Sequence, residues 1–318
     1  MEFFVAIRKR SFTKEISREF LLSGVSPSVH NRELKTFLQG GHMSGLKTSR
    51  RILASTAAIA LAVGVTVAAG SSANAATKPV TGGTLYFITH QEQFDHVDPA
   101  RVYTGRDIAF FNSYLYRNLV SYKPVPGSAG SSLVADLATN TGVPSNAAKT
   151  WKFTLRSGIT WEDGSKITCE DVKYGVSRPF ASDVITDGPQ YLVQALDIPK
   201  AADGSSEYKG PYKKTGQALY DKAVSCQGNT ITFKLNRSFA DFNYALTYPA
   251  GAPVKASKDT GDKYDLRPFA SGPYKIRSYK IGDQMELERN GAWKKRSEEH
   301  TSELQSLRHL VCRLLLEK

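Results

Sequence analysis

The chain has 318 residues, of which 41% are hydrophobic and 23% charged, and its formal net charge at pH 7 is +12. This composition is ordinary for a folded globular protein, and the length allows two domains. Residues 1–75 carry ten basic and four acidic side chains, whereas residues 76–295 carry 28 basic and 22 acidic side chains. Because charges of both signs are interspersed in the second segment, we expect a solvated surface and no nucleic-acid partner.

Residues 43–75 have the layout of a secretory signal peptide. In order they contain a basic cluster, an apolar run and an A-x-A cleavage site, at residues 47–51, 52–69 and 73–75. The apolar run is barely long enough to span a bilayer and is rich in alanine, so cleavage after Ala75 is favoured over a membrane anchor. We expect a secreted, extracytoplasmic protein, and the lack of a cysteine near Ala75 leaves no lipoprotein anchor.

Both ends of the chain are expected to lie outside the natural mature protein. Residues 1–42 show no export pattern, and residues 39–42 can be encoded by a purine-rich ribosome-binding site just before Met43. We predict that Met43 is the true start, and a genuine long leader is the alternative. Residues 296–306 read RSEEHTSELQS, which is the translation of a sequencing-library adapter. Residues 296–318 are therefore predicted to be artefactual.

Residues 76–295, which we call the body, begin with a predicted strand that is followed by a predicted helix. Residues 84–89 are β-rich and follow two glycines, which favours a first strand. After a polar loop, Asp107 opens a predicted helix with four apolar side chains on one face. These are Ile108, Phe111, Leu115 and Leu119.

Further along, residues 151–156 alternate between apolar and polar side chains, which predicts a half-buried strand. Asp163 and Gly164 predict a turn, and Thr168 with Asp171 has the spacing of a capping box before a helix over 169–180. Two hairpins and a surface loop are also predicted, at 222–226 with 230–235, 274–280 with 284–288, and 199–214. The expected class is α/β or α+β with short strands.

Cys169 and Cys226 are the two cysteines of the body. In an exported chain two cysteines are more often paired than free, so a disulfide is favoured over two buried thiols. The pattern itself does not show that the two residues are close in space.

The segment TWKFTLRSGITWEDGSKITCEDVKYGVSR at residues 150–178 resembles the signature of family 5 solute-binding proteins, which are the dipeptide-, oligopeptide- and nickel-binding components of ABC importers. Further matches follow the family order, at residues 82–85, 97–99, 115–119, 133–138, 271–274 and 289–293. The resemblance covers nearly all of residues 76–295.

This resemblance implies an α/β, type II periplasmic-binding-protein-like fold, in which two lobes close over a ligand like a clamshell. It further implies a monomer that takes a peptide or other small solute, passes it to membrane permease subunits and needs no cofactor. Family members are about twice as long as the body, so residues 76–295 are expected to form only the N-terminal lobe region. We therefore expect this chain not to trap a ligand alone.

The polar loop after the first strand is the candidate ligand cleft, since α/β ligand sites lie at the carboxyl ends of strands. Its candidate residues are His90, Asp95, His96, Asp98 and Tyr103. Their spacing matches no metal-ligand motif, so no metal site is expected, and a solvated polar loop is the alternative. The segment 271–273 is interpreted either as a crossing between lobes or as a simple turn.

Three other functions are alternatives to peptide capture. A secreted hydrolase is disfavoured because the body contains no GxSxG, HExxH or P-loop motif, so we expect no catalytic residues and no enzyme. Nickel or another small solute is the alternative within the family. A secreted scaffold is the alternative outside it, suggested by the missing lipid anchor.

Overall fold

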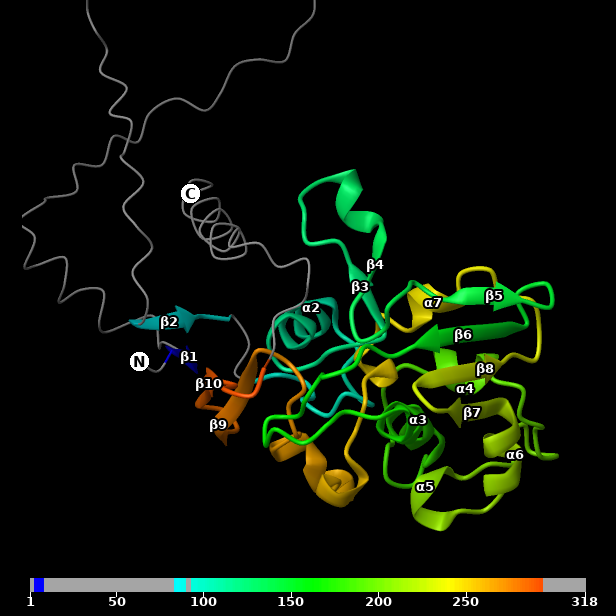
Figure 1. Ribbon diagram of the computed structural model, residues 1–318. Helices are drawn as coiled ribbons and strands as arrows, with labels where there is room; N and C mark the ends of the chain where they lie inside the picture. Colours follow the sequence, from blue (N-terminus) through cyan, green and yellow to red (C-terminus); the bar gives the residue numbers. More distant parts are fainter. Residues whose placement is uncertain (1–2, 9–82, 90–92, 294–318) are drawn as a thin grey trace, which may run out of the picture. The chain divides into compact units, whose positions relative to one another are not determined.

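The computed structural model describes residues 3–8, 83–89 and 93–293 (Figure 1). The signal-peptide segment 43–75, the tail 296–318 and most of the predicted extension 1–42 lie outside the described residues. None of the described helices is long and apolar enough to cross a membrane.

The larger hydrophobic core is built on an antiparallel sheet of four strands in the order β5-β6-β8-β7 (Figure 1). The strands are β5 (Val143–Ser145), β6 (Thr150–Thr154), β8 (Thr230–Lys234) and β7 (Val224–Gln227). The predicted alternation is confirmed, because Trp151 and Phe153 of β6 are buried while Lys152 is exposed. Helices α3 (Cys169–Ser177) and α6 (Gln217–Ala223) pack against β7 and β8 and cover the apolar side chains.

Helix α3 begins at the predicted capping box. The Thr168 hydroxyl accepts a hydrogen bond from the Asp171 amide, and the Asp171 carboxylate accepts one from the Thr168 amide. The two bonds satisfy donors that the first turn of a helix leaves free. The chain continues from α3 into a short 3-10 helix, η2 (Arg178–Phe180), which carries Arg178 into the interior.

Gly175 lets α3 approach the segment that contains Ala252. A methyl group on Gly175 would lie 2.1 Å from the carbonyl oxygen of Ala252. We expect Gly175→Ala to lower the free energy of unfolding by about 1–3 kcal/mol, because overpacking outweighs the better helix propensity of alanine. Urea denaturation followed by circular dichroism measures the change. Gly105→Ala, at an open helical position, is the control and should leave stability unchanged or slightly raised.

The smaller core lies under a second sheet with the order β2-β1-β10-β9. Its strands are β2 (Gly83–Phe87), β1 (Phe3–Arg8), β10 (Gln284–Arg289) and β9 (Tyr274–Lys280). Strand β1 runs parallel to β2 and antiparallel to β10. Strand β1 lies in residues 1–42, which are predicted to precede the true start, and a protein without them would expose the pairing edges of β2 and β10.

Helix α2 (Gly105–Tyr114) contributes Phe110 and Phe111 to this smaller core. The prediction that the helix runs on to Leu119 is wrong. The amides of Ser271 and Gly272 both donate to the carbonyl of Leu115, so another segment takes the acceptor that the next turn would use. Leu119 is apolar because it is fully buried in the larger core, not because it continues the helix.

The remaining elements are short. They are β3 (Val120–Tyr122), β4 (Leu133–Ala135), α4 (Tyr191–Ala195), α5 (Gly210–Lys213), α7 (Phe242–Ala245), η1 (Ser128–Ser131), η3 (Pro249–Gly251), η4 (Ala256–Lys258) and η5 (Gly261–Leu266). The predicted surface loop 199–214 is corrected in two places, since it contains α5 and its Tyr208 is fully buried. Lys222 lies in the last turn of α6 instead of opening a strand, and β7 begins at Val224. Both predicted hairpins are present.

Cys169 and Cys226 form a disulfide that joins the start of α3 to β7, with their Cα atoms 5.9 Å apart. The bond closes a loop of 57 residues that contains α3, α5 and α6. It fixes the first residue of α3 to the sheet.

Candidate functional site

Asp98, a predicted cleft residue, is fully buried in the loop that follows β2. Its carboxylate accepts hydrogen bonds from the guanidinium of Arg178, with Nη2 2.7 Å from Oδ2. The Nε of Arg178 donates to Asp259 at 2.9 Å, and the guanidinium lies 4.8 Å from the centre of the Tyr264 ring. Burial lowers the pKa of Arg178, but the two carboxylates outweigh it and hold that pKa well above its usual value. Arg178 therefore stays charged.

This arrangement corrects the interpretation of Asp98 as a ligand contact. The Asp98 side chain has no exposed surface, and its oxygens are taken by Arg178 and by the amide of Ala100. A solute has no access to such a carboxylate. Asp98 instead joins the loop to η2 through its ion pair with Arg178. The alternative of a solvated polar loop is also wrong for Asp98, because this residue is buried.

His96 is held between two carboxylates from distant parts of the chain. Its Nδ1 lies 2.8 Å from Asp265 and its Nε2 lies 3.0 Å from Asp187. Asp265 also accepts the amides of Val97 and Asp98. Each ring nitrogen therefore faces a carboxylate oxygen. His96 is 24% exposed, so it is partly accessible at the surface of the loop.

The segment around Asp187 docks on this loop through Arg101. The Arg101 Nε lies 2.7 Å from Asp187 Oδ1, and Nη2 lies 3.4 Å from Oδ2. Gly188 has φ +102°, and a methyl group there would lie 2.4 Å from the carbonyl oxygen of Ala100. A glycine is therefore required for the segment to come this close.

Tyr103, the last predicted cleft residue, is 54% exposed. Its hydroxyl lies 3.3 Å from the hydroxyl of Tyr191, which is 40% exposed, and the Tyr191 ring lies 5.1 Å from that of Tyr248. We call Tyr103, Asp187, Tyr191 and Tyr248 the Tyr103 face. It offers aromatic surfaces and phenol groups to solvent, which are groups that bind peptides, while the Asp187 carboxylate is held by Arg101 and His96.

The other two predicted residues stay apart from the Tyr103 face. Asp95 is exposed, and its amide donates to Asp107 at 3.1 Å. His90 lies outside the described residues. In the part of the chain that the structure describes, no group of three or more His, Cys, Asp or Glu side chains could hold a metal ion.

Sequence reasoning missed Asp187, Tyr191 and Tyr248 as members of this face. They lie in stretches without a motif, and Tyr191 is 88 residues away from Tyr103. The Asp187-Gly188 pair is a local signal for a turn, although it does not show which residues the turn approaches.

The segment 271–273 lies beside the end of α2, and its Ser271 and Gly272 are buried. The Ser271 hydroxyl accepts the amide of Arg117 at 3.0 Å, and the Asn290 side-chain amide donates to the carbonyl of Gly272 at 2.8 Å. These bonds tie the family-like segments 271–274 and 289–293 to each other and to the end of α2. Their role in this lobe is structural.

The contact with Arg101 lowers the pKa of Asp187 below its usual value of 3.8. Because this carboxyl has a lower pKa folded than unfolded, its contribution is present above about pH 4 and is lost as the pH falls through the lowered pKa. The side chain is 46% exposed, so the contribution is small. We expect wild type to be slightly more stable than Asp187→Asn at pH 5 and the difference to vanish in stronger acid. Thermal unfolding of both proteins across this range measures it, and a constant difference would contradict the assignment.

Comparison with known proteins identifies the family. The model for bacterial extracellular solute-binding proteins, family 5 (middle), matches residues 132–305, which is more than half of the chain. The chain belongs to family 5 of the bacterial extracellular solute-binding proteins. The predicted family is thereby confirmed.

Curated relatives cover this chain only in part. It is 28% identical over 149 residues to an oligopeptide-binding protein of Bacillus subtilis, which is 46% of this chain and 26% of the relative. It is 26% identical over 179 residues to a probable D,D-dipeptide-binding periplasmic protein of Escherichia coli. This match covers 54% of this chain and 29% of the relative. The chain thus spans between a quarter and a third of the length of these relatives.

Solved structures show the fold. A structure described as clavulanic acid biosynthesis oligopeptide binding protein 2 matches with a TM-score of 0.57 and 36% identity, over 64% of this chain and 35% of the other. The substrate-binding domain of an oligopeptide ABC transporter from Bacillus anthracis matches with a TM-score of 0.52 and 16% identity. The match covers 64% of this chain and 37% of the other. These matches confirm the predicted α/β, type II periplasmic-binding-protein-like class, of which this chain covers a part.

Proposed function

We propose that the complete protein captures oligopeptides outside the cytoplasmic membrane and delivers them to the permease of an ABC importer. The observation that carries this proposal is the 36% identity to an oligopeptide-binding protein over 64% of the chain. The names of the curated relatives, oligopeptide- and D,D-dipeptide-binding proteins, support the same ligand class. The proposed protein is a secreted monomer that binds peptide without transforming it.

In this proposal the Tyr103 face forms part of the peptide cleft, and the Asp98–Arg178 pair holds the loop that carries it. Tyr103 and Tyr191 contribute aromatic surface and hydroxyl groups that can donate to or accept from a peptide backbone. The relatives are three to four times as long as the matched segment, so the opposing wall comes from residues that this chain does not contain. We propose that the 318-residue chain alone does not retain peptide.

Tyrosine substitutions test the face directly in the complete protein. We expect Tyr103→Leu and Tyr191→Leu each to weaken the binding of a mixture of di- to pentapeptides by about three- to tenfold, because each removes an aromatic contact. Tyr122→Leu is the matched control, since Tyr122 is an exposed tyrosine whose ring pairs with Tyr244 at 6.2 Å. If Tyr122→Leu weakened peptide binding equally, the Tyr103 face would not be part of the cleft. Binding of nickel in place of peptide, or of neither, would overturn the peptide assignment.

A further inference from the structure

His96 joins three segments that lie far apart in the sequence. Its Nε2 is 3.0 Å from the Asp187 carboxylate, and its Nδ1 is 2.8 Å from the carboxylate of Asp265, which is 169 residues away. Arg101, from the same loop, reaches the carboxylates of Asp187 and Asp265 at 2.7 Å and 3.7 Å. Two side chains of one loop therefore hold two separate segments of the chain.

The attachment of Asp265 to the loop does not depend on His96. Asp265 also accepts the backbone amides of Val97 and Asp98, at 2.6 Å and 2.7 Å. These two bonds would remain if the imidazole were removed, and they keep Asp265 against the loop. Loss of the imidazole is therefore expected to leave η5, which carries Asp265, in place.

The attachment of Asp187, in contrast, depends on side chains. Among the described residues, its carboxylate is bound by Arg101 and His96 and accepts no backbone amide. The next residue, Gly188, packs so closely on the loop that a methyl group there would lie 2.8 Å from the Cα of Arg101. We call His96, Arg101, Asp187 and Gly188 the Asp187 junction.

Tyr191, the first residue of α4, lies beside Tyr103 just after the Asp187 junction. The two hydroxyls are 3.3 Å apart, and the ring centres are 6.5 Å apart. The helix has five residues, and its N-cap, Gln190, forms no side-chain cap hydrogen bond. The buried Leu192 attaches the helix to the larger core, whereas the Asp187 junction fixes the chain that enters its first turn.

We propose that His96 is a positioning residue for peptide binding, which acts through its Nε2 contact with Asp187 and holds Tyr191 beside Tyr103. The proposal rests on the peptide function proposed above, in which the two phenols contact one ligand. Without the imidazole, Arg101 is the one side chain left on the Asp187 carboxylate among the described residues. Tyr191 then samples more positions, and a peptide must order it on binding, which weakens affinity.

Glutamine and asparagine separate the two contacts of His96, because each places an amide nitrogen near one of the two imidazole nitrogens. His96→Gln keeps a donor toward Asp187, and His96→Asn keeps one toward Asp265. Fluorine NMR of the fluorotyrosine-labelled 318-residue chain follows Tyr191, whose resonance is assigned by its loss in Tyr191→Phe. We expect His96→Asn to shift or broaden this resonance and His96→Gln to leave it within the wild-type line width. Equal changes in both variants, or no change in either, would overturn the positioning role.

The peptide affinity of the complete protein tests the consequence. We expect His96→Asn to weaken the binding of di- to pentapeptides about three- to tenfold, the effect of one hydrogen bond, and His96→Gln by less than about twofold. A merely structural role would lower affinity in the order of thermal stability instead. If wild type binds peptide and the two variants bind it equally, the positioning role is wrong. If the fluorine signal separates the variants but wild type binds no peptide, the proposed function fails and the placing of Tyr191 stands.

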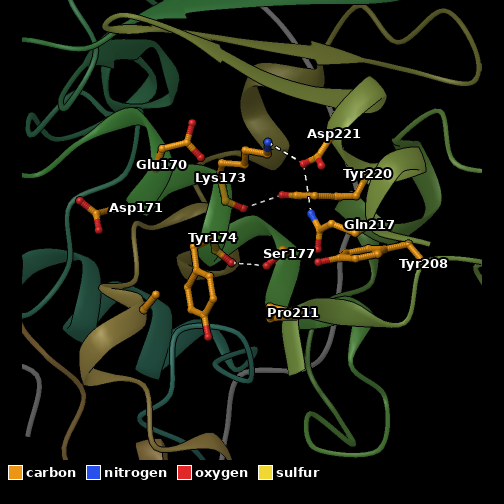
Figure 2. Close-up of a pocket in the computed structure, with 11 residues that line it drawn as sticks. Glu170, Asp171, Lys173, Tyr174, Ser177, Tyr208, Pro211, Gln217, Tyr220 and Asp221 are labelled. Carbon is orange, nitrogen blue, oxygen red and sulfur yellow. Dashed lines mark hydrogen bonds and ion pairs between the residues drawn. The ribbon is translucent and has the colours of Figure 1, made fainter. Parts of the chain in front are cut away.

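Asp187→Ala and Asp221→Ala form a matched pair of variants. Asp221 pairs with Lys173 at 2.7 Å, and both acidic side chains are 46% exposed. Figure 2 shows the Lys173–Asp221 pair in the wall of a pocket of about 300 Å³ whose lining includes no residue of the Asp187 junction. Asp187→Ala should reproduce the effect of His96→Asn on the Tyr191 resonance, and Asp221→Ala should leave that resonance at its wild-type position. A shift of the same size in both would contradict the assignment.

Discussion

Replacing Arg178 with methionine is expected to lower the free energy of unfolding by about 3–5 kcal/mol, which is the cost of leaving buried charge without its partner. The substitution removes the guanidinium between Asp98 and Asp259, whose carboxylates have little or no exposed surface. Asp98 and Asp259 would then be buried carboxylates without a cation, so each must take up a proton or be hydrated by water that enters the core. Urea denaturation followed by intrinsic fluorescence measures the change in the 318-residue chain.

A matched control is Lys213→Met, which breaks an ion pair between Lys213 and Asp183 in which both side chains are exposed. Exposed pairs of this kind contribute little, so its unfolding curve should overlay that of wild type. If Arg178→Met were as mild as Lys213→Met, the buried ion pair would not hold the loop. Arg178→Lys should fall between the two, because lysine keeps the charge but cannot bind two carboxylates through a planar fork.

Reducing the Cys169–Cys226 disulfide is expected to lower the free energy of unfolding by about 4 kcal/mol, since the bond closes a loop of 57 residues that is free in the reduced unfolded chain. Urea denaturation with and without a reducing agent measures the difference. The double substitution Cys169→Ser, Cys226→Ser should show the same loss and no further response to reduction.

The state of the two cysteines can be checked before stability is measured. An Ellman assay under denaturing, non-reducing conditions should find no free thiol from these two residues, because both are in the bond. Cys312, in the tail outside the described residues, is replaced by serine for this assay. One or two free thiols per chain, together with unfolding that does not respond to reduction, would contradict the disulfide.

Local patterns predicted the elements whose causes lie within about ten residues. The capping box of Thr168 and Asp171, the alternation of β6 and the two hairpins are each set by neighbouring side chains or by a turn. The end of α2 was missed because its cause is distant. The carbonyl of Leu115 is taken by Ser271 and Gly272, and periodicity within residues 107–119 carries no information about them.

The candidate site was predicted less well for the same physical reason. The loop after β2 was correctly singled out as a place where polar groups gather, and Tyr103 is exposed there. However, Asp98 is paired with an arginine 80 residues later, and Tyr103 with a tyrosine 88 residues later. From sequence alone, a polar residue next to a proline, such as Asp98, is predicted to lie in a solvated loop, because its buried partner lies far away in the chain. Long-range pairing therefore decided which predicted residues face solvent.

The central claim is that the complete protein binds oligopeptides and that this chain supplies only one wall of the cleft. The direct test is isothermal titration of two proteins, the 318-residue chain and a family 5 protein of the relatives' length that carries residues 76–293 of this chain as its N-terminal part, with the same di- to pentapeptides. We predict saturable binding at one site by the complete protein and no heat of binding by the 318-residue chain. Micromolar binding by the shorter chain would show that one wall suffices, and no binding by the complete protein would contradict peptide capture.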